Sequence, residues 1–201
     1  MLLGIVVWLA VVGAGMSRLM HYESRAGAGS NAPERWPRDS RLVRRNGESI
    51  LLMFVHPKCP CSRASLDELA EVLRALPQRL QPCVVVCRQA GFSDAEIKTD
   101  LWDQAKSIPD VAVVCGEPEE ATRFGVLTSG QVLFYDERGI LRFRGGITRA
   151  RGVGGAGESR NALFSAVLHQ SDTVAEAAVF GCPLFDVEEG TPRACCKRPM
   201  K

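Results

Sequence analysis

The chain alternates short apolar runs with stretches in which apolar residues recur every three or four positions. Its clearest apolar run is Ile50 to Val55, which Pro57 ends. From Leu66 to Leu76 apolar residues return at helical spacing, with charged residues between them, until Pro77 closes the pattern. Run length and period therefore predict a buried strand that leads into an amphipathic helix.

The same alternation continues along the chain. Further apolar runs predict strands at 83–87 and 111–115, and helical patterns cover 93–106, 117–124 and 158–169. Two more runs, 131–136 and 140–145, flank the tripeptide ERG and predict a hairpin. Because parallel neighbours need crossover connections, this order predicts an α/β fold whose parallel core is extended by an antiparallel hairpin.

The N-terminal segment differs from everything that follows. Residues 1–16 carry no charge, and the apolar stretch extends to residue 20 if Arg18 snorkels. A run of this length favours a transmembrane helix that anchors the chain, with a cleaved signal as the alternative. Residues 21–47 are rich in Gly, Pro, Ser and charge, which is typical of a flexible linker.

Composition limits the rest of the organisation. With 201 residues, 46% of them hydrophobic, the chain has enough apolar material for one core. We expect one domain over 48–170 and a C-terminal tail over 171–201. A net charge of +2 with scattered arginines excludes a nucleic-acid surface. Eight cysteines are compatible with an oxidising compartment, so we expect a periplasmic or extracytoplasmic domain. Arg18 and Arg25 argue against that orientation.

The candidate chemistry lies where the first strand leads into the first helix, in the sequence HPKCPCS. Pro60 is suited to the first helical position, which places Cys59 at the cap and Cys61 in the first turn. Unpaired amides and the helix dipole favour an anion there, and Lys58 and Arg63 add positive charge. The sequence therefore predicts a reactive thiolate at Cys59.

A strand, a tight turn, a cysteine pair and a helix in this order resemble the thioredoxin superfamily. The strings HPKCPCSRASLDEL, GVLTSG and GGIT resemble the RedB-type group of membrane-anchored bacterial thioredoxin-like proteins. The resemblance implies a three-layer fold with a mixed sheet of about four to five strands flanked by helices. One residue separates the cysteines here, where the superfamily usually has two. Thr128 and Ser129 stand where the superfamily has a cis proline, and a trans bond is expected there.

The resemblance implies thiol-disulfide exchange with protein thiols or disulfides, and needs no cofactor. Cys59, taken as the more exposed and more acidic sulfur, would attack a substrate disulfide, and Cys61 would resolve the mixed disulfide. The ring closed by a CPC disulfide is small, so we expect an oxidising or isomerising bias. The electron donor or acceptor is not encoded in any motif. Ser129 is expected to present backbone groups or its hydroxyl to the sulfur.

Two alternatives remain open. Two thiolates with the imidazole of His56 are soft ligands that suit copper, so the domain could bind or deliver that metal. A non-catalytic thioredoxin-like binding domain is the other alternative, in which His56 is simply a partly exposed residue at a strand end.

The remaining cysteines have simpler interpretations. Cys83 and Cys87 lie on one predicted strand, too far apart to bond each other, and are expected to be buried structural thiols. Cys182 has apolar neighbours and is expected to be buried against the domain. Cys195 and Cys196 would be exposed, either as an incidental pair or as an electron relay to the CPC cysteines. Asp67 and Glu68 are expected to be solvated on the outer face of their helix.

Overall fold

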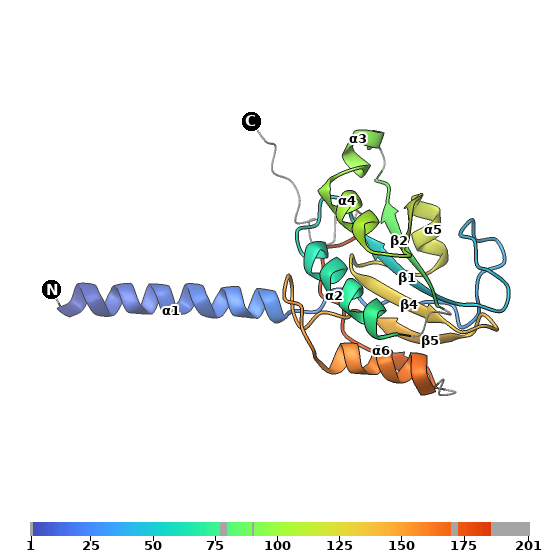
Figure 1. The fold of residues 1–201 in the computed structure, drawn as a ribbon. Helices are drawn as coiled ribbons and strands as arrows, with labels where there is room; N and C mark the ends of the chain where they lie inside the picture. Colours follow the sequence, from blue (N-terminus) through green and yellow to red (C-terminus); the bar gives the residue numbers. More distant parts are fainter. Residues whose placement is uncertain (1, 77–79, 90, 170–172, 186–201) are drawn as a thin grey trace.

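The structure, a computed structural model, describes residues 2–76, 80–89, 91–169 and 173–185. An N-terminal helix projects from a domain in which helices surround a sheet (Figure 1). The helices are α1 (Leu2–Ser24), α2 (Ser62–Ala75), α3 (Asp94–Ile97), α4 (Asp100–Ser107), α5 (Pro118–Arg123) and α6 (Glu158–His169). The strands are β1 (Ser49–Val55), β2 (Leu80–Cys87), β3 (Ala112–Gly116), β4 (Gln131–Tyr135), β5 (Leu141–Gly145) and β6 (Ala175–Glu176).

The sheet is mixed and has the strand order β3-β2-β1-β4-β5-β6. Strands β1, β2 and β3 are parallel, and β4 and β5 form the predicted antiparallel hairpin beside β1. Gly139 has a φ of +74° in the hairpin turn, a conformation that glycine adopts at little cost. The sixth strand, β6, pairs in parallel with β5. The predicted thioredoxin-like α/β fold is confirmed, with six strands instead of four or five.

Both faces of the sheet are covered, which explains why β1 is buried along its whole length. On one face, alternate strand residues pack under α2, α4 and α6. On the other face, the strands pack against α5 and against chain segments that include Ala32, Trp36 and Leu184. The central strand therefore lies at the middle of three layers, and its carboxyl end is a rigid place from which to hold a site.

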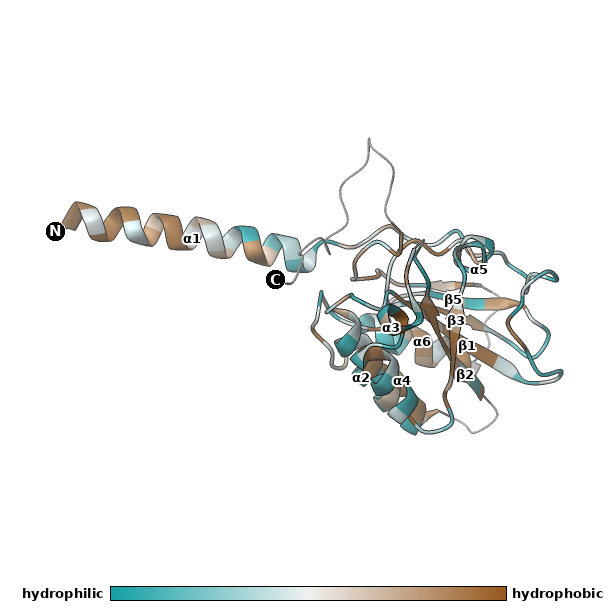
Figure 2. Ribbon diagram, turned by 90° about the horizontal axis from the view of Figure 1, so that it is seen from above, coloured by the Kyte–Doolittle hydropathy of each residue, from teal (hydrophilic) through white to brown (hydrophobic). Residues whose placement is uncertain are grey.

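Helix α1 is mostly apolar and contains no buried residue, and only its C-terminal end contacts the domain. Its hydrophobic residues form most of the projecting helix, and hydrophilic residues appear where it meets the domain (Figure 2). By length and composition it is long and apolar enough to cross a membrane, and a signal sequence would pass the same test. Within the described residues, the segment predicted over 1–20 corresponds to α1, which runs from Leu2 to Ser24.

The predicted flexible linker is instead packed along the domain. The amide of Gly27 donates to Val179, that of Asn31 to Gly125, and that of Trp36 to Gly139. The Trp36 ring stacks edge-on against Phe124 and Tyr135, with ring centroids 5.1 and 5.5 Å away. The expectation of a flexible linker missed these contacts, because backbone hydrogen bonds can form with any residue type and so cannot be read from composition.

Two further expectations need correction. The helix predicted over 93–106 is two helices, α3 and α4, and the Ser93–Glu96 capping box starts only the first. Glu68 is also buried rather than solvated, with 3% of its surface exposed. Its carboxylate accepts from the Arg160 guanidinium at 2.8 Å and from the Gly155 amide at 2.6 Å. The 151–157 loop and α6 cover this side of α2, so a charge there must be paired. Asp67 is exposed, as expected.

Candidate active site

The site occupies the turn between β1 and α2. β1 ends at Val55, and a turn follows in which the Cys59 amide donates to the His56 carbonyl at 3.1 Å. α2 begins at Ser62, with Cys61 at its N-cap. The helix therefore starts two residues later than predicted, so that Cys59 lies in the turn and Pro60 is not the first helical residue. The cause is local: the Cys59 carbonyl already accepts from the Ser62 amide at 3.1 Å.

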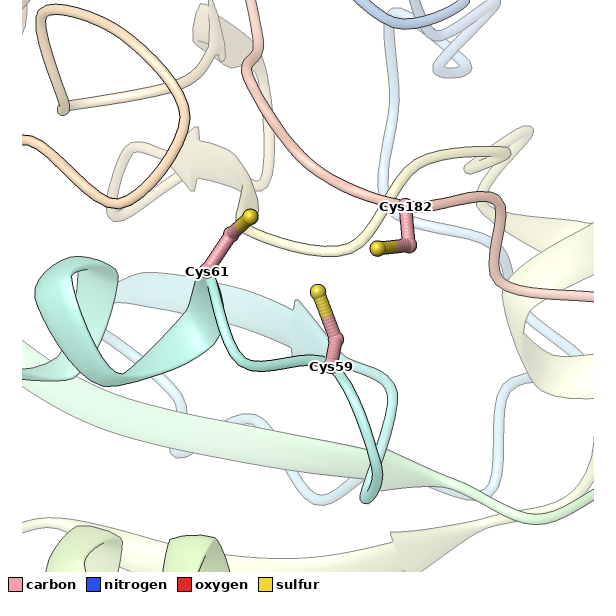
Figure 3. A group of neighbouring side chains, drawn as sticks. All are labelled: Cys59, Cys61 and Cys182. Atoms are coloured by element: carbon pink, nitrogen blue, oxygen red, sulfur yellow. The ribbon is translucent and has the colours of Figure 1, made fainter. Parts of the chain in front are cut away.

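Three sulfurs meet at this turn. The Sγ atoms of Cys59, Cys61 and Cys182 all lie within 4.8 Å of one another. Cys59 and Cys61 come from the turn and from the start of α2, and Cys182 comes from the C-terminal segment that crosses above them (Figure 3). None of the three is in a disulfide in this structure. The third cysteine is the main feature that sequence reasoning missed, because it lies 121 positions after Cys61 in the chain.

The C-terminal segment is held by backbone pairing with residues 127–129. The Ser129 amide donates to the Cys182 carbonyl at 2.8 Å, and the Leu184 amide donates to the Leu127 carbonyl at 2.8 Å. Thr128 and Pro183 form an antiparallel bridge between these two bonds. Cys182 and Leu184 are buried, so the segment belongs to the folded domain and is not a loose tail.

Hydrogen bonds to sulfur make Cys59 the acidic thiol. The side chain of Cys182 has the largest effect, followed by that of Cys61, and both lower the pKa of Cys59 well below its usual range. Burial acts in the opposite direction and is outweighed, with Ser62 adding a further hydrogen bond. Donors aimed at a sulfur stabilise its thiolate, which is the nucleophilic form.

Cys61 has the opposite character. A hydrogen bond with Cys182 lowers the pKa of Cys61, but its role as donor to Cys59, burial and the neighbouring Cys59 charge together raise it. Cys61 is partly exposed, whereas Cys59 has no exposed surface. The expectation that Cys59 is the more acidic sulfur fits this pattern, but the expectation that it is the more exposed one is wrong. The segment that carries Cys182 lies over it.

A chain of buried hydroxyls leads from the backbone to Cys59. The His56 amide donates to Ser129 Oγ at 2.8 Å, and Ser129 Oγ lies 2.7 Å from Ser62 Oγ. Because the Ser129 oxygen accepts from the amide, its proton is available for Ser62, whose proton can then point at the Cys59 sulfur. The Ser129 hydroxyl, which was expected to face the sulfur, thus bonds to His56 and Ser62, and the Ser129 amide donates to the Cys182 carbonyl. The described peptide bonds include no cis bond, as predicted for Thr128–Ser129.

Thr128, unlike Ser129, bonds to the N-terminal segment. Its hydroxyl donates to the Ala28 carbonyl at 2.9 Å, and its side chain is buried. A Cβ added at Gly27 would come within 2.6 Å of the Thr128 methyl group, so the chain that leaves α1 passes directly against this residue. Thr128 thus fixes the N-terminal segment beside the site instead of facing the sulfurs.

The two basic residues predicted to favour the thiolate are engaged elsewhere. The Lys58 ammonium pairs with Glu96 at 2.8 Å and lies 4.3 Å from the centre of the Phe92 ring. Arg63 forms an ion pair with Asp100. These pairs tie the turn and α2 to α3 and α4. Arg151 does act on the cluster, because its charge lowers the pKa of Cys61.

His56 is buried and supports the turn. Its Nδ1 accepts from the Lys58 amide at 3.0 Å, and its ring meets Phe92 edge-on. Among the described residues, the group close enough to share a metal ion is the three cysteines, without His56. The ligands available for copper are therefore the three cysteines, with Cys182 in place of the His56 imidazole that the sequence indicated.

Two further cysteines of the described chain, Cys83 and Cys87, lie away from the cluster. Cys83 and Cys87 are buried on the face of the sheet opposite α2, as expected. Burial raises the pKa of Cys83 to about 12 and that of Cys87 still further. Both are neutral structural thiols. Cys195 and Cys196 lie outside the described residues.

Comparison with known proteins supports the fold. No protein-family model and no curated protein matches the chain. Among solved structures, an uncharacterized conserved protein from Geobacillus kaustophilus has a TM-score of 0.54 at 13% identity, covering 82% of this chain and 94% of that one. A hypothetical protein from Sinorhizobium meliloti 1021 also has a TM-score of 0.54, at 16% identity, covering 81% and 96%.

A secreted disulfide oxidoreductase from Mycobacterium tuberculosis aligns over 62% of this chain and 83% of its own, with a TM-score of 0.42 and 18% identity. At these identities the two structures with TM-scores of 0.54 support the thioredoxin-like α/β fold and nothing beyond the fold. Because one fold hosts many functions, activity has to be argued from the cysteine site itself.

Proposed function

We propose that the protein is a thiol-disulfide oxidoreductase that exchanges disulfides with protein substrates through Cys59 and Cys61. The observation that carries the proposal is a pair of free sulfurs within 4.8 Å of each other, one with a lowered and one with a raised pKa. Such an asymmetric pair suits a nucleophile and a resolving thiol. The cysteine motif and the strings quoted above also lead us to group the chain with the RedB-type proteins.

The reaction conserves electrons between sulfurs. The Cys59 thiolate attacks one sulfur of a substrate disulfide, and the other substrate sulfur leaves as a thiolate that takes up a proton. Cys61 then loses its proton and attacks the Cys59 sulfur, which releases the reduced substrate and forms the Cys59–Cys61 disulfide. A dithiol donor can then attack the Cys59 sulfur, which releases Cys61 as a thiol. The second thiol of the donor resolves the mixed disulfide, so that the donor leaves oxidised and the Cys59–Cys61 pair is reduced again. The small CPC ring favours an oxidising or isomerising direction.

We place this chemistry at an extracytoplasmic membrane surface. The apolar helix α1 serves as an anchor, and its end lies close to the site: the Arg151 amide donates to the Glu23 carbonyl at 3.1 Å, and its guanidinium lies 5.1 Å from the Tyr22 ring centre. The same Arg151 acts on Cys61. A substrate or electron donor that lies in or near the membrane would have the shortest path to the cysteines.

The test is exchange by the full chain in detergent micelles, measured as reduction of insulin and as oxidation of a reduced dithiol peptide. Cys59→Ser should abolish both activities, and Cys83→Ser, a buried cysteine outside the cluster, should retain them. A metal chelator should have no effect. Equal rates for wild type and Cys59→Ser would overturn the proposal.

A second candidate function has its own support, because a third sulfur completes a soft, three-thiolate ligand set. Such a set suits Cu(I). The discriminating measurement is Cu(I) binding in competition with a chromophoric chelator. Metal delivery requires tight binding that is lost in Cys182→Ser and kept in His56→Ala, together with no exchange activity.

A further inference from the structure

The C-terminal segment occupies the edge where a substrate strand would pair. Residues 181–184 run antiparallel to residues 127–129, joined by the Ser129–Cys182 and Leu184–Leu127 backbone bonds. This pairing holds the Cys182 sulfur within 4.8 Å of both CPC sulfurs. A polypeptide strand that carries a cysteine is thus already docked beside the nucleophile, and it belongs to the same chain.

Several contacts fix the segment in this position. Arg151 donates to the Gly181 carbonyl, and Gln89 donates to the Leu184 carbonyl, from opposite ends of the segment. A Cβ at Gly181 would overlap the Ser129 carbonyl oxygen, so only glycine permits this close approach. The main chain on both sides of Cys182 is held, and so its sulfur stays aimed at the cluster.

We propose that Cys182 is a third exchange cysteine, which forms a disulfide with Cys59 and so competes with Cys61 as the resolving thiol. This rests on the proposed function, because it requires that Cys59 exchanges disulfides. Starting from the Cys59–Cys61 disulfide, Cys182 loses its proton and its sulfur attacks Cys59 Sγ. The Cys59–Cys182 bond forms, the Cys59–Cys61 bond breaks, and Cys61 leaves as a thiolate that takes up the proton. No electrons enter or leave, so the step needs no oxidant.

As a consequence, a disulfide at Cys59 has two possible resolving thiols. A mixed disulfide between Cys59 and a substrate can be resolved by Cys61 or by Cys182, and in each case the substrate leaves reduced. In the second case the product is a disulfide that fastens the C-terminal segment over the site. The Ser129 amide and the Leu127 carbonyl are already paired with this segment while the three cysteines are thiols, and the disulfide would keep that pairing from opening to an external strand until a donor thiol reduces the bond.

The test follows from the trypsin sites in the sequence. Cleavage after Lys58 and Arg63 releases Cys59 and Cys61 together in peptide 59–63, and cleavage after Arg160 and Arg193 releases Cys182 alone in peptide 161–193. Full-length Cys61→Ser is equilibrated in detergent with oxidised and reduced glutathione, alkylated, digested and analysed by mass spectrometry. The expected product is peptide 59–63 linked by a disulfide to peptide 161–193.

Matched variants interpret the result. In Cys61→Ser/Cys182→Ser, Cys59 should instead retain glutathione, since neither resolving thiol remains. Cys61→Ser/Cys83→Ser, which removes a buried thiol outside the cluster, should still give the linked peptides. Circular dichroism checks that each variant is folded.

Two results would overturn the inference, and they differ. If Cys61→Ser carries glutathione on Cys59 while Cys182 is fully alkylated, then Cys182 is not an exchange partner, although the proposed function stands. If Cys59 forms no disulfide in any variant or in wild type, the proposed function fails, and the third-cysteine role fails with it.

Discussion

Removing the Ser62 hydroxyl tests how the protein makes Cys59 acidic. In Ser62→Ala the last hydroxyl of the buried chain is lost, and with it one hydrogen bond to the sulfur. Ser62 has 1% of its surface exposed, so water does not replace the missing donor. A hydrogen bond to a charged group contributes about 1.5–3 kcal/mol. Each 1.36 kcal/mol corresponds to one pH unit, so the titration midpoint of the Cys59 thiolate should rise by about one to two pH units.

The assay is the ultraviolet absorbance of the thiolate as a function of pH, in reductant, with the Cys59 signal assigned by its loss in Cys59→Ser. Ser129→Ala should move the midpoint in the same direction. It should also lower the free energy of unfolding by about 1–3 kcal/mol, since the His56 amide loses its buried Ser129 acceptor. Ser107→Ala, on the exposed end of α4, is the control. An unchanged midpoint in Ser62→Ala would refute the hydroxyl chain as a cause of the acidity.

Three further predictions concern stability, each measured by denaturant unfolding of the full chain in detergent. Glu68→Gln should cost about 2 kcal/mol, because the Arg160 guanidinium, whose side chain is 21% exposed, and the Gly155 amide lose a buried carboxylate, while Glu71→Gln at an exposed pair should cost about 0.5 kcal/mol or less; similar losses would contradict the role of the buried carboxylate. Gly125→Ala should cost about 2 kcal/mol or more, since φ is +60° and a Cβ would lie 2.3 Å from the Asn31 carbonyl oxygen. Gly152→Ala, with φ of +70° but open space, should cost about 1 kcal/mol, and equal costs would show that residues 31–36 do not pack on the domain. The third is a pH dependence. Because folding lowers the pKa of Cys59, the unfolded state binds more protons below the unfolded pKa of about 8.5, so the stability of the reduced protein should rise with pH towards that value and fall as the pH is lowered. Cys59→Ser should flatten this dependence, and above about pH 8.5 the raised pKa of Cys61 acts in the opposite direction.

The sequence alone predicted the elements whose burial leaves a local, periodic pattern of apolar residues. The run from Ile50 to Val55 and the helical period from Leu66 to Leu76 predicted β1 and α2, because burial on both faces and an amphipathic stripe each leave a periodic pattern. The same reasoning located the cysteine pair at the junction. The start of α2 was misplaced by two residues, since the preference of Pro60 for a first turn was overridden by the turn at Cys59.

The parts that sequence reasoning missed depend on contacts between distant segments. Cys182 joins the site through backbone pairing with residues 127–129, and backbone bonds place no requirement on residue type that can be read from one sequence. Gly181, directly before Cys182, was a signal in the sequence, because glycine alone tolerates this close contact with the Ser129 carbonyl. The acidic partners of Lys58 and Arg63 were missed for the same reason, because they lie on α3 and α4.

The central claim is that Cys59 and Cys61 form a reversible redox pair, and equilibration of the full chain in graded glutathione buffers tests it most directly. After acid quenching, alkylation and trypsin digestion, peptide 59–63 reports the state of the pair. The account predicts a reversible two-electron transition in which both cysteines become protected from alkylation together as the buffer becomes more oxidising. The potential should be less negative than the value of about −270 mV for thioredoxin. A pair that remains two alkylated thiols at every buffer ratio would contradict it.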